Sequence, residues 1–220
     1  MKNSAYIVLL ASLALPITGC QTIKPAHDAS AQSTQTDDAL VRAMAKSGSS
    51  NASLMMLEKK YKNDSQNASA ALNYAHALRQ ASYLNRASLV LKPFANSTNP
   101  KDGVLSEMSM IELAMANYDS AENYAQKAIV QNPQDYIAYQ NLGIALDAKE
   151  MHHEAERAFR KGLEHWKGDP TTIMNNLALN LATQGFIEEA IEVLERAQAL
   201  SPDRIEIERN LRIIRTLNER

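Results

Sequence analysis

The chain has 220 residues, 45% of them hydrophobic and 22% charged, which excludes collagen, wholesale disorder and a polytopic membrane protein. Glycine and proline contribute 7 residues each, about half of the ~12% of an average protein, and aromatic residues are scarce, so an all-helical fold is favoured over a β-sandwich or barrel. The 23 Lys and Arg against 25 Asp and Glu give a net charge of −2, so no general field attracts nucleic acid.

The amino terminus has the pattern of a secretion signal. Lys2 supplies one positive charge, and the 13 residues from Ala5 to Ile17 are uncharged and almost wholly apolar. As a helix this run spans about 20 Å, which is too short for the ~30 Å hydrocarbon core of a bilayer. Residues 1–19 are therefore predicted to be a signal peptide.

The lone cysteine closes that apolar run. Ile17-Thr18-Gly19-Cys20 resembles the bacterial lipobox, and a single cysteine excludes an internal disulfide. Cys20 is predicted to be the lipidated first residue of the mature chain, the alternative being an ordinary signal peptide with a stray cysteine. By the same resemblance, Gln21 stands where an aspartate would retain the protein in the inner membrane. We therefore expect an outer-membrane lipoprotein that faces the periplasm.

The next segment is small and polar, without apolar periodicity. Residues 20–36 are predicted to be a flexible tether, because they lack apolar side chains to offset the entropy of ordering.

The body of the chain repeats with a period close to 34 residues. Ala87, Ala121, Ala155 and Ala190 are separated by 34, 34 and 35 positions. A second small site, at Ala75, Ser109, Gly143 and Ala178, has the same spacings. Two registers with one period indicate duplicated helical hairpins, in which small residues let the two helices approach closely.

These units resemble the tetratricopeptide repeat (TPR), most clearly over Asn175 to Pro202 and Tyr139 to Gly162. The resemblance implies an all-α fold, a right-handed α-solenoid of TPR hairpins with a C-terminal capping helix and about eleven helices. The predicted units are a degenerate hairpin at 37–64, four repeats at 68–101, 102–135, 136–170 and 171–204, and a cap at 205–220. Phe94 and Glu112 depart from the usual pattern.

The histidines are the only plausible starting points for catalysis. His152 and His153 are interpreted as solvated surface, and His165 as a packing residue at a repeat junction. The sequence has no HExxH, G-x-S-x-G, phosphate-binding glycine loop or dinucleotide fingerprint. We therefore expect no catalytic residue, metal, cofactor or small-molecule substrate.

A binding groove is expected on the first helix of each hairpin, as in other TPR solenoids. The position after each small site places His76, Met110, Ile144 and Leu179 on it, and an open apolar ladder of this kind usually marks a partner. Alternatively, neighbouring helices or the amino-terminal hairpin cover these residues. Asparagines recur at one further register, where TPR relatives often use them to bind a ligand backbone: Asn73, Asn141 and Asn176. No lysine pattern for an acidic tail is present, so a segment with apolar anchors fits better.

A lipobox followed by a short TPR array resembles the TadD family, the TPR lipoproteins of the tight-adherence (Tad, Flp) pilus assembly system. The resemblance is strongest over Asn141 to Arg215. It implies a non-catalytic, pilotin-like factor that helps a secretin or its partners to assemble. A type IV pilus pilotin, or a periplasmic regulator of a cell-envelope enzyme, would use the same scaffold.

Overall fold

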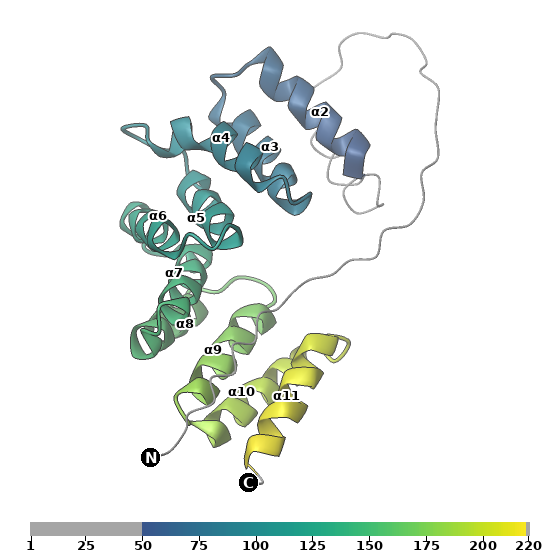
Figure 1. The fold of residues 1–220 in the computed structure, drawn as a ribbon, viewed down its shortest axis with the longest axis vertical. Helices are drawn as coiled ribbons and strands as arrows, with labels where there is room; N and C mark the ends of the chain where they lie inside the picture. The colour runs from purple at the N-terminus through teal and green to yellow at the C-terminus, as the bar shows by residue number, and fades with distance from the viewer. Residues whose placement is uncertain (1–49, 219–220) are drawn as a thin grey trace.

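The computed structural model describes residues 50–218, and this part of the chain is all helical (Figure 1). Its ten helices are α2 (Ser50–Asn63), α3 (Ala68–Gln80), α4 (Leu84–Ala95), α5 (Val104–Ala114), α6 (Tyr118–Gln131), α7 (Tyr136–Ala148), α8 (His152–Glu164), α9 (Thr171–Thr183), α10 (Ile187–Leu200) and α11 (Ile205–Asn218). The predicted signal peptide, Cys20, the tether and the start of the first hairpin lie outside the described residues. Among the helices of residues 50–218, none is both long and apolar enough to cross a membrane.

Four helical hairpins follow one another along the chain. They pair α3 with α4, α5 with α6, α7 with α8, and α9 with α10. The helix α2 packs on α3 before the first hairpin, and α11 packs on α10 and α9 after the last. The expectation of an all-α hairpin array is therefore confirmed, with ten helices in the described part of the chain.

Each hairpin turns through one residue with a left-handed backbone. These residues are Ser82, Ala116, Glu150 and Gly185, with φ between 59° and 88°. The next amide in each turn donates to a carbonyl five residues back, at 2.8–3.0 Å: Tyr83 to Leu78, Asn117 to Glu112, Met151 to Leu146, and Phe186 to Leu181. This is the Schellman arrangement, and only the last turn uses the glycine that it favours.

Both predicted small registers are buried. Ala87, Ala121, Ala155 and Ala190 have no exposed surface, and neither have Ala75, Ser109 and Ala178. The larger apolar residues around them form two clusters, one built mainly from α3 to α5 and the other from α8 to α11. Small residues at these points let the helix backbones approach, and the larger side chains fill the spaces between hairpins.

The cap buries only part of its apolar stripe. Ile207, Leu211 and Ile214 are buried against the last hairpin, whereas Ile205 is 77% exposed and Leu217 41% exposed. Asn210 lies within the buried stripe, and its amide donates to Asn175 Oδ1 at 2.8 Å. The end of the array is thus closed by three aliphatic side chains and one polar pair.

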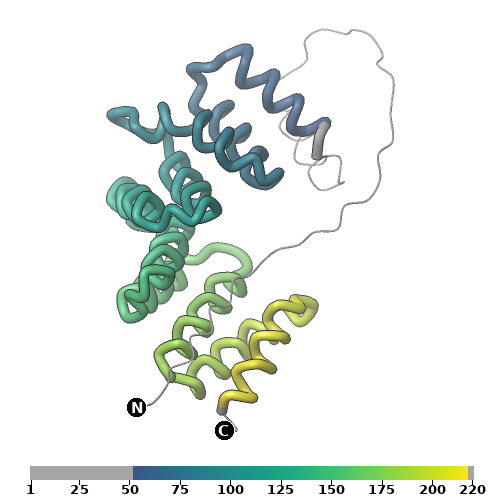
Figure 2. The backbone as a smooth tube through the Cα atoms, viewed as in Figure 1, coloured from purple at the N-terminus to yellow at the C-terminus, as the bar shows by residue number. Residues whose placement is uncertain are grey.

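The first helices of the hairpins form a continuous inner layer. The helix α5 contacts α3 and α7, α7 contacts α9, and α9 contacts α11. Within the described residues, the backbones of α4, α6, α8 and α10 do not approach one another closely, and Arg160 of α8 reaches Glu189 of α10 only through its side chain, at 2.7 Å. The stack therefore curves with its first helices on the concave side, between α2 at one end and α11 at the other (Figure 2).

Candidate functional site: a hollow on the concave face

A hollow of about 470 Å³ lies on this concave face, and we call it the groove hollow. The helix α3 contributes Leu72, Asn73 and His76, and α5 contributes Met110. Ile137, at the start of α7, lines it as well. Three successive first helices therefore build one surface, which no single repeat contains. Three of the residues predicted for the groove, Asn73, His76 and Met110, meet there.

The floor of the groove hollow is an ion cluster centred on Glu107. This carboxylate is only 6% exposed. Arg79 Nε donates to Glu107 Oε1 at 2.6 Å, and His76 Nδ1 lies 3.0 Å from Glu107 Oε2. Both carboxylate oxygens are thus engaged, and the Arg79 charge neutralises the Glu107 charge.

The electrostatics of that cluster lower the pKa of Glu107. Burial alone raises the pKa, but hydrogen bonds from His76 and Arg79, together with the positive charge of Arg79, outweigh it and hold the pKa below its ordinary value. Glu107 is therefore a carboxylate at neutral pH and stabilises the contact between α3 and α5.

Polar groups surround the apolar part of the groove hollow. Ser106 Oγ donates to Asp135 Oδ2, and Asp135 Oδ1 accepts from the Ala138 amide at 3.0 Å, so Asp135 caps α7. Asp102 comes from the turn before α5, and Lys167 from the turn before α9. The hollow thus offers apolar, amide, carboxylate and ammonium groups to a partner.

Asn141 has a different role from the one expected. It is 2% exposed, and its Nδ2 donates to the Ser106 carbonyl oxygen at 3.1 Å. The amide therefore ties α7 to α5, and the expectation that Asn141 offers hydrogen bonds to a ligand needs correction. The reason is geometric, since the register of Asn141 faces the preceding repeat and an acceptor is available there.

The other predicted groove residues are only partly accessible. Ile144 and Leu179 are half-buried and pack against the core cluster of α8 to α11. Asn176 is half-buried. Neighbouring helices cover part of this stretch, which is the alternative that the sequence left open. None of the three lines the groove hollow.

Glu107 and Arg79 were not identified from the sequence as residues of the groove. A signal existed, because Glu107 stands 34 residues after Asn73 and 34 before Asn141, in the asparagine register. A charged residue there predicts an interaction between repeats. Its partner could not be found from one unit alone, because Arg79 belongs to the preceding repeat.

His152 is not a solvated side chain as interpreted from the sequence. Its Nδ1 lies 2.7 Å from Asp147 Oδ1, and that same oxygen accepts from Asn180 Nδ2 at 2.7 Å. Gln184 Nε2 extends the network to Glu156 Oε2 at 3.2 Å. The network joins the third hairpin to the fourth.

The remaining histidines differ in their surroundings. His153 is exposed, and the ring of His165 stacks on Tyr139 with centroids 5.8 Å apart, in agreement with the packing role predicted for it. Within residues 50–218, no three His, Cys, Asp or Glu side chains gather in a way that could hold a metal ion.

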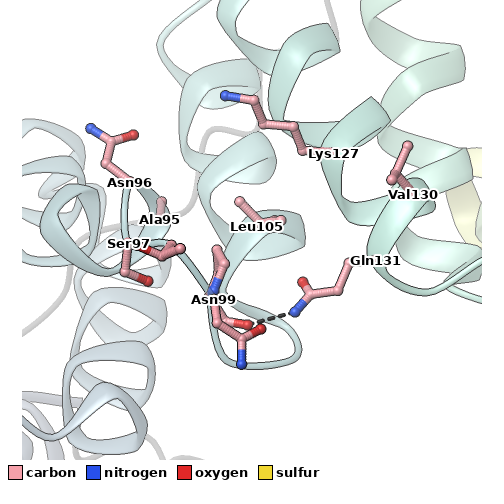
Figure 3. Close-up of a pocket in the computed structure, with 10 residues that line it drawn as sticks. Ala95, Asn96, Ser97, Asn99, Leu105, Lys127, Val130 and Gln131 are labelled. Carbon is pink, nitrogen blue, oxygen red and sulfur yellow. Dashed lines mark hydrogen bonds between the residues drawn. The ribbon is translucent and has the colours of Figure 1, made fainter.

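A second hollow, of about 590 Å³, lies between the turn from α4 to α5 and the helix α6. Figure 3 shows Lys127, Val130 and Gln131 of α6 across from that turn. Gln131 Nε2 donates to the Pro100 carbonyl oxygen at 2.5 Å, which fixes the turn against α6. The predicted groove residues do not line this hollow.

Comparison with known proteins bears on the fold. The family model of the tetratricopeptide repeat matches residues 171–204, which is the fourth predicted unit. No curated protein matches the sequence.

Several solved structures are similar. A thermophilic TPR protein of Thermus thermophilus has a TM-score of 0.71 and 17% identity over 82% of this chain and 97% of its own. A chain of the Cut9-Hcn1 hetero-tetramer of the APC/C has a TM-score of 0.76 and 16% identity over 84% of this chain and 37% of its own. YrrB, described as a TPR protein with an unusual peptide-binding site, has a TM-score of 0.55 and 18% identity over 78% of this chain and 88% of its own. Residues 50–218 therefore have the fold of an all-helical tetratricopeptide-repeat array.

Proposed function

We propose that the protein is a non-catalytic scaffold that binds a protein partner through the groove hollow. The observation that carries this proposal is the meeting of Leu72, Met110 and Ile137 on a concave surface built by three repeats. Apolar side chains left accessible in a concavity favour a partner that covers them. The peptide-binding site in the description of YrrB is consistent with this use of the fold.

The finer proposal is that the scaffold is an outer-membrane lipoprotein, anchored at Cys20 and facing the periplasm. It rests on the lipobox resemblance at Ile17 to Cys20 and on the absence of aspartate at position 21. Together with the TadD resemblance over Asn141 to Arg215, this supports a role in Tad (Flp) pilus assembly, with a secretin or another assembly component as the partner.

Substitution of Met110 tests the binding proposal. Met110→Asp puts a charge among the apolar groups of the groove hollow, whereas Met110 packs against neither core cluster, so the fold should persist. We expect the partner to be lost when the complex is crosslinked and purified from cell envelopes. Met55→Asp is the matched control, because Met55 is 71% exposed on α2 and lies outside the hollow.

The partner recovered with the unsubstituted protein decides the assembly role. A secretin of the Tad system supports it. A type IV pilus secretin or a cell-envelope synthase would instead support one of the two alternative roles. Equal recovery of the partner with Met110→Asp and with the unsubstituted protein would contradict binding through the groove hollow.

Substitution of Cys20 tests the anchor. Cys20→Ser should leave a folded helical protein that moves from the outer-membrane fraction to the soluble periplasmic fraction, because the acyl chains are lost. Retention of the variant in the outer-membrane fraction would contradict lipidation at this position.

A further inference from the structure

Two cations of the array are already paired. Arg79 is held by Glu107 at 2.6 Å. Lys149, which follows α7, pairs with Asp119 at 2.6 Å and with Glu122 at 2.8 Å. These positive charges are therefore not available to an acidic partner.

Two carboxylates of the groove hollow lack such pairing. Asp135 accepts hydrogen bonds from neutral donors, the Ser106 hydroxyl and the Ala138 amide. Within residues 50–218, no cation pairs with Asp135 and no hydrogen bond or ion pair reaches the Asp102 carboxylate. Lys167, in the turn before α9, lines the same hollow, and within residues 50–218 it forms no ion pair with Asp102 or Asp135. The hollow therefore carries two unpaired carboxylates against one unpaired ammonium.

An apolar surface lies beside these carboxylates. Leu72 and Met110 are half-buried, and Ile137 is 37% exposed. They come from α3, α5 and α7, and they line the same hollow as Asp102 and Asp135. A partner that buries an apolar side chain there brings its neighbouring residues next to the unpaired carboxylates.

We propose that the groove hollow selects a protein segment in which an apolar side chain lies within about one helical turn of a lysine or arginine. The apolar side chain contacts Leu72, Met110 and Ile137, and the cation lies beside Asp102. This inference rests on the proposed function and adds the chemistry of the partner. Glu107 contributes indirectly, because its pairing with Arg79 withdraws the cation that would otherwise favour an acidic segment.

A display library of random peptides tests this selection. The protein used is the mature chain that carries Cys20→Ser. It is immobilised in this form and in three further forms, each with one additional substitution. Asp102→Lys reverses the charge at the hollow, and Met110→Asp removes the apolar contact. Asp203→Lys is the matched control, because Asp203 is an exposed aspartate in the turn before α11 and outside the hollow.

We expect the unsubstituted groove to enrich peptides that pair an apolar residue with Lys or Arg. Asp102→Lys should abolish the preference for the basic residue, and Asp203→Lys should preserve it. For a selected peptide, Asp102→Asn should raise the Kd about threefold, the size expected of one exposed ion pair, and should reduce the dependence of Kd on salt.

Enrichment of acidic peptides by the unsubstituted protein would overturn the inference. An unchanged basic preference in Asp102→Lys would overturn it as well. Peptides that require Met110 but show no charge preference would contradict this inference alone. Peptides that bind Met110→Asp equally well would contradict the proposed binding site too.

Discussion

The close approach of α7 to α8 depends on the absence of a side chain at Gly143, and Gly143→Ala tests that dependence. A Cβ atom at this position would lie 2.5 Å from Phe159 Cε1, 2.6 Å from Cδ1 and 2.8 Å from Cζ. Phe159 is 1% exposed, so its ring has no room to swing away from the contact. The helix must therefore shift or the ring must leave its position.

The expected magnitude is a balance of two effects. Alanine in a helix interior is about 1 kcal/mol more favourable than glycine. Overpacking of a well-filled core costs about 1–3 kcal/mol, and a contact this close to a buried ring belongs at the upper end. We expect a net loss of about 1–2 kcal/mol, which lowers the Tm by about 2–8 °C for a chain of this size.

Thermal unfolding followed by circular dichroism measures this loss. The control is the same substitution in a Phe159→Leu background, because leucine lacks the ring atoms that the new methyl group meets. There, Gly143→Ala should cost less than about 0.5 kcal/mol, or should stabilise the protein through the helix propensity of alanine. An unchanged Tm in the Phe159 background, or an equal loss in both backgrounds, would refute the packing argument.

Three further predictions concern the turns, the ion cluster and the asparagine register. Ala116→Gly should raise the free energy of unfolding by about 0.5–1 kcal/mol. The left-handed backbone at Ala116 costs about 1–2 kcal/mol when a Cβ is present, and the greater conformational entropy of glycine in the unfolded chain offsets part of the relief. A lower unfolding midpoint in urea would contradict this. The lowered pKa of Glu107 means that its contribution to stability is present above the ordinary value of 4.5 and is lost as the pH falls through the pKa of the folded state. The Tm of the unsubstituted protein should therefore fall below about pH 4.5 more steeply than that of Glu107→Gln, and parallel pH profiles would count against the ion cluster. Asn141→Ala should lower the free energy of unfolding by about 1–2 kcal/mol, because it removes a buried donor to the Ser106 carbonyl. Asn73→Ala, at an exposed position, should lower it by less than about 0.5 kcal/mol. Equal losses in urea unfolding would show that burial does not distinguish the two asparagines.

The hairpin array could be predicted because its packing constrains single residues. A close contact between helices requires a small side chain at the same point of every unit, so Ala75, Ser109, Gly143 and Ala178 reveal the period. The turns left a weaker signal. Ser82, Ala116 and Glu150 adopt the left-handed backbone that glycine would mark, and only Gly185 shows it in the sequence.

The candidate site could be predicted only in part, because neighbouring repeats determine what each side chain contacts and whether it stays exposed. Asn73 and Asn141 share one register, but Asn141 reaches the Ser106 carbonyl of the preceding repeat and Asn73 remains exposed. Glu107 in the same register pairs with Arg79. These outcomes depend on pairs of residues some 28 to 35 positions apart, which one repeat does not contain.

Photocrosslinking in cells is the sharpest test of whether the concave face binds a protein partner. A photoreactive amino acid replaces His76 in the groove hollow or Leu89 on α4, where Leu89 is 76% exposed. We expect a discrete crosslinked protein from position 76 that disappears with Met110→Asp, and no such product from position 89. A crosslinked partner from position 89 with none from position 76 would contradict binding through the groove hollow.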